Sequence, residues 1–127
     1  IAIKAAIKTV SAKNANFGLK VRCGANDDGY TVYFAGGKIG IGKKSNGTWR
    51  VLKETASQSP LHEMSQLAVV LHGDQIVAYV NGKSVLTVSD NELKSGSVGV
   101  MAYNSAAIFH DIQIQRIPQK LPLNWHP

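Results

Sequence analysis

The side chains that could perform acid–base catalysis are few and widely spaced in this sequence. The chain of 127 residues has eight carboxylates, at Asp27, Asp28, Glu54, Glu63, Asp74, Asp90, Glu92 and Asp111. Hydrolysis of a glycosidic bond with retention needs two carboxylates that flank the bond about 5 Å apart. Only Asp90 and Glu92 have the i, i+2 spacing that places two side chains on one strand face, and they lie in a predicted loop. We therefore predict no catalytic residues, and a non-catalytic role is favoured over an enzyme.

One segment carries residues that could bind a metal ion. The four histidines, at positions 62, 72, 110 and 126, lack the H-x-H or H-x-x-x-H spacing typical of a zinc site. The NDDG segment at 26–29 offers the oxygen donors of Asn26, Asp27 and Asp28, which are the ligands that calcium prefers. The same residue types are also typical of a plain turn. Calcium at this loop is one prediction, and a turn without a ligand is the alternative.

Aromatic residues provide the pattern that favours sugar binding, because flat rings can stack on the apolar faces of pyranoses. The candidate ligand-binding residues are Tyr33, Trp49, Tyr79 and Tyr103. Tyr33 and Tyr79 alternate with aliphatic residues along their segments, so we expect both on the face opposite the aliphatic one. Ordinary burial of amphipathic rings is the alternative interpretation.

The charge balance is basic, with a formal net charge of +6 and a sequence pI of about 9.6. Arginines are few and form no block, so we predict no nucleic-acid binding. No apolar run reaches the roughly 20 residues that a membrane helix needs, so we predict no membrane insertion. Lys4, Lys8, Lys20 and Arg22 alternate with apolar residues on two predicted strands. If those strands are neighbours, the four cations form a basic patch for an acidic polysaccharide or an acidic neighbouring domain. Lysines that only keep the strands soluble are the alternative.

The elements that must position these side chains are β-strands. Apolar and polar residues alternate with a period of two along most of the chain, and Gly, Asn and Asp clusters separate the runs. Asn81-Gly82 is the strongest turn signal, because a type I′ hairpin turn needs positive φ at both central residues. We predict about ten antiparallel strands in an all-β protein. Several runs are apolar on both faces, which indicates two packed sheets.

Five segments resemble the concanavalin A-like lectin/glucanase superfamily, and their order along the chain also fits. GDQIVAYVNGK at 73–83 resembles its G-N-x-I-x-V-Y-V-N-G-K hairpin. FGLKVRC at 17–23, followed by DDGYTVYF at 27–34, resembles the preceding strand and hairpin. ELKSGSVGV at 92–100 and AAIFHDIQI at 106–114 resemble the closing elements. Within the superfamily, the pattern is most similar to laminin-G-like domains and to the bacterial 3-keto-disaccharide hydrolase domain family.

This resemblance implies a jelly-roll sandwich of two antiparallel sheets over residues 1–117. The family usually has an opening strand or two before the position of Ile1. Two expectations follow: the domain is trimmed of these strands, or the chain is a fragment of a longer protein. Residues 118–127 carry three prolines and are predicted to form an extended tail. Since laminin-G-like domains often bind calcium at a loop rim, the resemblance also supports the calcium prediction.

The function that the resemblance implies is a non-catalytic carbohydrate-binding or adhesion module. Such a module belongs to a secreted or surface protein, so the expected location is extracellular, periplasmic or at the cell surface. The alternatives are a glycoside-processing enzyme similar to the 3-keto-disaccharide hydrolases, and a structural domain that assembles with a neighbouring domain or subunit. Laminin-G-like domains and glucanases share this fold with different functions, so the fold alone does not decide between the three.

Overall fold

A computed structural model of the chain describes seven stretches of backbone. These are residues 2–7, 9–13, 16–35, 38–56, 66–102, 106–110 and 113–117. The strands are β1 (Ala2–Ile7), β2 (Thr9–Lys13), β3 (Asn16–Cys23), β4 (Gly29–Ala35), β5 (Lys38–Ser45), β6 (Thr48–Ala56), β7 (Leu67–His72), β8 (Gln75–Val80), β9 (Lys83–Ser89), β10 (Ser97–Ala102), β11 (Ala106–His110) and β12 (Gln113–Ile117). Besides these strands, the described stretches contain one short 3-10 helix, η1 (Ala25–Asp27), and no helix long and apolar enough to cross a bilayer. The tail predicted at 118–127 lies outside the described residues.

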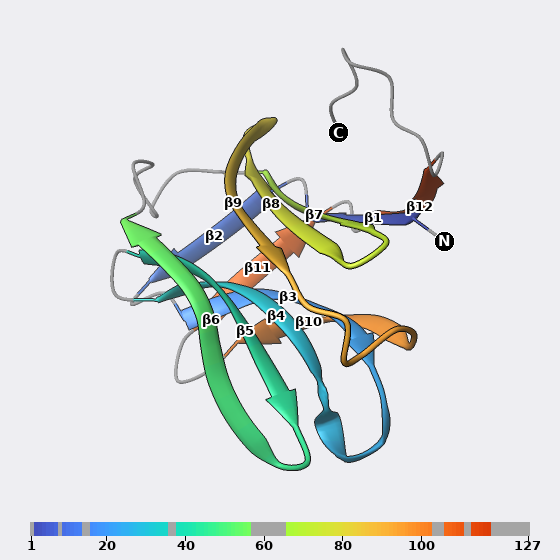
Figure 1. Ribbon diagram of the computed structural model, residues 1–127. Coiled ribbons are helices and arrows are strands. Elements are labelled where there is room, and N and C mark those ends of the chain that lie inside the picture. Colours follow the sequence, from blue (N-terminus) through green and yellow to red (C-terminus); the bar gives the residue numbers. More distant parts are fainter. Residues whose placement is uncertain are drawn as a thin grey trace.

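The strands form two five-stranded antiparallel sheets, which confirms the all-β sandwich prediction. The first, which we call the groove sheet, has the order β10-β3-β4-β5-β6. The second sheet has the order β12-β1-β7-β8-β9, and β11 and β2 form a separate two-stranded ribbon. Figure 1 shows the two five-stranded sheets as separate layers. The closing segment of the chain forms two strands, β11 and β12, which pair with β2 and β1.

Two of the hairpins form where the sequence places Asn-Gly pairs. Asn81 and Gly82 have φ angles of 53° and 81°, and Val80 pairs with Lys83 across them. Asn46-Gly47 joins β5 to β6 in the same way, with φ angles of 51° and 78°. Positive φ at both positions is what a type I′ turn requires, and its twist matches that of the strands. The predicted turn at Asn81-Gly82 is therefore confirmed.

The inner faces of the two sheets meet in one apolar core. The groove sheet contributes Phe17, Leu19, Val21, Tyr30, Val32, Phe34, Ile39 and Ile41. The second sheet contributes Leu67, Val69, Leu71, Ile76, Ala78, Val80 and Leu86. Because successive side chains of a strand point to opposite faces, filling the core from β3, β4 and β5 leaves every second residue of these strands for the outer face.

Three β-bulges interrupt this alternation. In β3, Val21 and Arg22 together oppose the single residue Val98 of β10. Leu52 is the extra residue in β6, and Val85 is the extra residue in β9. A bulge shifts the residues beyond it by one position, so that they point to the other face of the sheet. Two of these bulges decide which charged side chains reach the outer face of the groove sheet.

Candidate functional site

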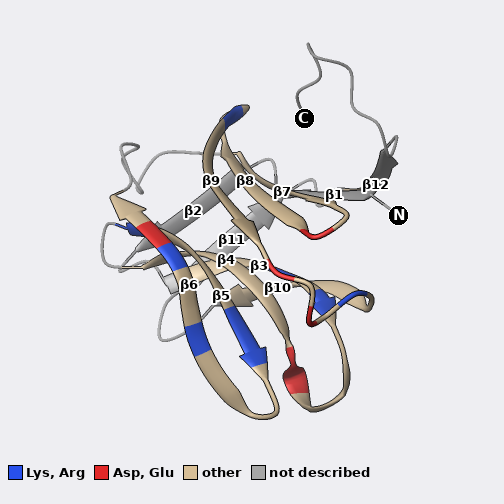
Figure 2. Cartoon of the chain, viewed as in Figure 1, with Lys and Arg blue, Asp and Glu red and all other residues tan. Residues whose placement is uncertain are grey.

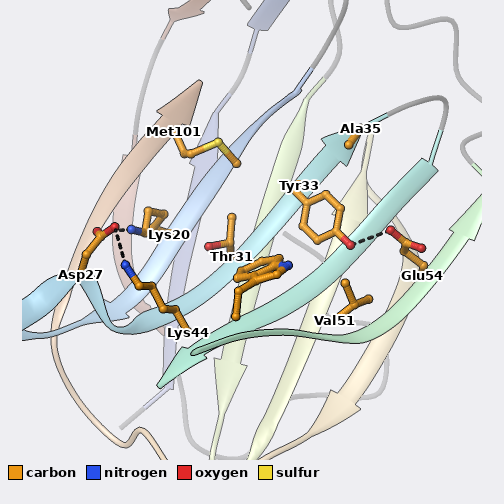
Figure 3. A pocket seen from close by; sticks show the side chains of 10 residues that line it. Lys20, Asp27, Thr31, Tyr33, Ala35, Lys44, Val51, Glu54 and Met101 are labelled. Atoms are coloured by element: carbon orange, nitrogen blue, oxygen red, sulfur yellow. Dashed lines mark hydrogen bonds and ion pairs between the residues drawn. The ribbon is translucent and has the colours of Figure 1, made fainter. Parts of the chain in front are cut away.

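The outer face of the groove sheet carries an open groove of about 670 Å³. Its lining side chains come from five strands and the η1 turn. They are Lys20, Asp27, Thr31, Tyr33, Ala35, Lys44, Trp49, Val51, Glu54 and Met101. Figure 3 shows the Lys20–Asp27–Lys44 group at one end of the groove and Tyr33 with Glu54 at the other. The groove therefore has charged groups at both ends.

Two glycines of β5 make room for the aromatic rings of the groove. A Cβ atom added to Gly42 would lie 2.1 Å from Cη2 of Trp49, and one added to Gly40 would lie 2.4 Å from Oη of Tyr33. Both rings therefore lie directly over backbone that has no side chain. Gly within a strand commonly marks such a close approach. Since Gly40 and Gly42 are two residues apart, both openings are on the same face of β5.

Trp49 and Tyr33 form the aromatic part of the site. Their ring centroids are 5.8 Å apart with the planes tilted by 60°. Trp49 is 48% exposed, whereas Tyr33 is 5% exposed, so Trp49 offers a ring face to a ligand and Tyr33 supports it. The Tyr33 hydroxyl donates to Oε1 of Glu54 at 2.7 Å. Burial and this hydrogen bond raise the pKa of the Tyr33 phenol well above its usual value, so it stays a neutral donor.

Glu54 reaches the groove because of the bulge in β6. Val51 pairs with Gly42 and Lys53 with Ile41, which leaves Leu52 as the extra residue. Without the bulge, regular alternation from Trp49 would place residue 53 on the groove face. The bulge brings Glu54 into register with Gly40 instead, next to Tyr33. Bulges commonly re-aim a side chain next to a functional site.

Two lysines share one carboxylate at the other end of the groove. Nζ of Lys20 on β3 forms a hydrogen bond and ion pair with Oδ1 of Asp27. Nζ of Lys44 on β5 lies 3.8 Å from Oδ2 of the same residue. The hydrogen bond and the charge of Lys20 lower the pKa of the Asp27 carboxyl, with a smaller contribution from Lys44. We call these three residues the groove cluster.

A second charged group lies on the inner side of the same sheet, and we call it the buried cluster. Lys43 Nζ contacts Oδ2 of Asp90 at 2.9 Å and Oε1 of Glu92 at 3.0 Å. The Tyr30 hydroxyl donates to Oδ1 of Asp90 and accepts from the amide of Leu93 at 3.2 Å. Burial and the bond to Asp90 raise the pKa of Tyr30 to about 12. The buried cluster therefore joins the 90–93 segment to the groove sheet.

The predicted aromatic set is only partly brought together. Tyr33 and Trp49 meet in the groove. Tyr79 lies on β8 of the second sheet and is half-buried, so it belongs to another surface. It pairs with Ala68, on the face opposite the core as expected. Tyr103 lies outside the described residues.

The prediction of one basic patch is wrong. Lys4 is on β1 and Lys20 is on β3, and these strands belong to different sheets. Arg22 is 9% exposed and donates to the carbonyls of Leu93 at 3.2 Å and Gly73 at 3.0 Å. The bulge in β3 explains this, because it gives Arg22 a φ of 52° and ends its alternation with Lys20. Lys8 lies outside the described residues. Figure 2 shows cations and acids interspersed along the groove sheet rather than one basic face.

The calcium prediction fits poorly with the surroundings of its residues. Asn26 and Asp27 are in the η1 turn, and the Asp27 carboxylate faces two ammonium groups. Oδ2 of Asp28 instead accepts from the amide of Asn46 at 3.1 Å. Among the described side chains, no group of three or more His, Cys, Asp or Glu could hold a metal ion. The two lysine charges next to the Asp27 carboxylate would repel a calcium ion. Calcium binding therefore stays an untested prediction, and these contacts disfavour it.

Sequence patterns did not identify several groove residues. Lys44 and Glu54 reach the groove because of how their strands pair with neighbouring strands. The alternation of residues within a single strand does not show that pairing. The glycine spacing was the available signal, since IGIG at 39–42 removes two side chains from one strand face. Thr31 and Met101 carried no pattern that separates them from other residues on outer strand faces.

The fold is an antiparallel β-sandwich with an open groove on the outer face of one sheet. No protein-family model and no curated protein matches the sequence. The carbohydrate-binding module CBM66 from Bacillus subtilis is similar in structure, with a TM-score of 0.81 and 17% identity over 90% of this chain and 74% of that chain.

Two galectins are also similar in structure. Sheep galectin-11 in complex with glycerol has a TM-score of 0.73 and 12% identity, over 91% of this chain and 90% of that chain. The galectin LEC-6 from Caenorhabditis elegans has a TM-score of 0.70 and 16% identity, over 90% and 82%. At such low sequence identities, the similarity shows a shared fold and nothing more. It is consistent with the predicted concanavalin A-like sandwich, while the resemblance to laminin-G-like or hydrolase domains stays a prediction.

Proposed function

We propose that this chain is a non-catalytic carbohydrate-binding module and that the groove around Trp49 is its binding site. The observation that carries the proposal is the half-exposed Trp49 ring, seated over Gly42 and flanked by polar side chains. The names of the structurally similar proteins, a carbohydrate-binding module and galectins, support the same role.

The groove offers a sugar ring two kinds of contact. Trp49 and Val51, 48% and 43% exposed, supply an apolar surface for the C–H face of a pyranose. Glu54 can accept hydrogen bonds from sugar hydroxyls, and Lys44 can donate them. A mostly apolar site with a few placed polar groups is typical of small-molecule recognition. Because Tyr33 already fixes Glu54, the acceptor is oriented before the ligand arrives.

The groove acids support binding more than hydrolysis. Figure 3 places Asp27 and Glu54 at opposite ends of the groove, and each is already paired, with lysines or with Tyr33. The lowered pKa of Asp27 is unfavourable for a general acid, which must hold a proton near neutral pH. A glycoside-processing enzyme and an assembly domain are therefore the weaker proposals. A secreted or surface protein remains the proposed setting for the module.

A glycan-array screen of the purified chain tests this proposal. We expect the chain to bind a defined set of glycans and Trp49→Ala to lose that binding by at least about tenfold, because the stacking surface is removed. Lys53→Ala, on the same strand but outside the groove lining, is the matched control and should bind like the parent. Binding that is equal in all three proteins would overturn the assignment of the groove.

A further inference from the structure

We propose that the groove selects carbohydrates that carry carboxylate groups, and that Asp27 is a built-in competitor for the ligand's carboxylate. This inference rests on the proposed function and adds the substrate class. In the free protein the Asp27 carboxylate lies against both Lys20 and Lys44. In the complex, a uronate carboxylate takes its place between the two ammonium groups. The next ring of the sugar chain then lies over Trp49.

The charge of the groove cluster favours an anionic ligand. Two lysines and one aspartate leave a net charge of +1 on the cluster while Asp27 is in place. If Asp27 moves away, two ammonium groups face the groove without a counter-charge. Hydrogen bonds between an ammonium and a carboxylate are stronger than neutral ones, so a carboxylate on the ligand is the group that best restores the balance.

The exchange of the Asp27 carboxylate for a ligand carboxylate costs little free energy, because the groups that exchange are exposed to solvent. The Asp27 side chain is 68% exposed and that of Lys44 is 35% exposed, so both stay partly hydrated. The Lys20 side chain is 18% exposed, but it has a carboxylate partner before and after the exchange. Solvent-exposed ion pairs contribute little to folding stability. Replacing one exposed carboxylate by another therefore changes the free energy of the fold very little, whereas the ligand keeps its contacts with the rest of the groove.

The backbone of the η1 turn is also consistent with a displacement of the Asp27 side chain. Asn26 and Asp27 both have positive φ, 60° and 63°, a conformation that non-glycine residues adopt at some cost. The turn is closed by backbone hydrogen bonds from Gly24 to Asp28, at 2.9 Å, and from Asp28 to Ala25, at 3.4 Å. Asp28 anchors one end of the turn through the amide of Asn46. The Asp27 side chain is thus held over the groove mainly by the two lysines.

The test is a titration of the full chain with polygalacturonate, with its fully methyl-esterified neutral form and with dextran sulfate, which carries sulfates but no carboxylates. We expect the ratio of affinities for polygalacturonate and for its neutral ester to rise about tenfold in Asp27→Asn and to fall about tenfold in Lys44→Gln. Lys83→Gln, on the β8–β9 hairpin, makes the same change in net charge outside the groove and should match the parent. Unfolding midpoints of all variants establish that each is folded.

The outcomes separate this inference from the proposed function. If Trp49→Ala abolishes binding but Asp27→Asn and Lys44→Gln leave the ratio of acidic to neutral affinity unchanged, the carboxylate site is wrong and the module remains. An equal loss in Lys83→Gln and Lys44→Gln would show a general charge effect and overturn the inference. Tight binding of dextran sulfate without binding of polygalacturonate would overturn the choice of carboxylates over sulfates. Binding of every glycan regardless of Trp49 would overturn both proposals.

Discussion

Lys43 and Lys44 are neighbours in the chain and belong to clusters with opposite properties. Lys43 points inward, its side chain is 8% exposed, and it contacts Asp90 at 2.9 Å and Glu92 at 3.0 Å. Lys44 points to the groove, its side chain is 35% exposed, and it lies 3.8 Å from Asp27. Strand alternation alone separates these two identical side chains. One dipeptide therefore supplies a residue to the buried cluster and a residue to the groove cluster.

The difference teaches that burial, rather than the presence of an ion pair, decides what a charged cluster does. Removing one member of a buried pair leaves a desolvated charge without a partner, which is strongly destabilising. Removing one member of an exposed pair returns the other to water at little cost. The buried cluster therefore has a structural role, whereas the lysines of the groove cluster can exchange one carboxylate partner for another.

The largest expected effect is on stability, from a change in the buried cluster. Asp90→Asn should lower the free energy of unfolding by about 3 kcal/mol, because Lys43 loses one of its two close carboxylates and Tyr30 loses a charged acceptor. Urea denaturation measures this change. Asp27→Asn in the groove cluster is the control, and its denaturation midpoint should equal that of the parent. Equal midpoints for both variants would contradict the assigned roles.

The two glycines of β5 offer a matched pair of smaller changes. Gly40→Ala presses a methyl group against the buried Tyr33 ring and should destabilise the fold by about 1–3 kcal/mol. Gly42→Ala presses against the half-exposed Trp49 ring, which can move outward. Its unfolding midpoint should therefore stay near that of the parent, whereas carbohydrate affinity falls about tenfold. Calorimetry and urea denaturation on both variants measure the two effects, and retained affinity in Gly42→Ala would argue against a fixed Trp49 platform.

The smallest expected effect is on the acid dependence of stability. Burial alone would raise the pKa of Asp90, but hydrogen bonds from Tyr30 and Lys43 outweigh it and hold that pKa below its usual value. A lowered folded-state pKa gives stability that is present above the unfolded value, about 4, and is lost as the pH falls through the folded one. The stability difference between the parent and Asp90→Asn should therefore be constant from pH 5 to 8 and shrink below about pH 4. A difference that persists unchanged at pH 2 would count against this role of Asp90.

Sequence patterns predicted what depends on local geometry. The Asn81-Gly82 turn and the alternation in β4 and β8 follow from the backbone preferences of single residues and pairs, and both are present. Two of the errors fall at bulges, and a third, the expected proximity of Lys4 and Lys20, comes from strands that belong to different sheets. Arg22 was expected on the outer face, and Glu54 was not recognised as a groove residue, because an inserted residue in one strand is defined by pairing with another strand. Such pairing is not visible in the period of a single segment.

The most direct test of the carbohydrate groove is the emission of Trp49 during a ligand titration. The chain has two tryptophans, so Trp125→Phe leaves Trp49 as the sole indole reporter. With a glycan identified on the array, the account predicts a saturable shift of emission to shorter wavelength, with the same dissociation constant as calorimetry gives. Saturable heat of binding without any change in the emission of Trp49 would contradict it.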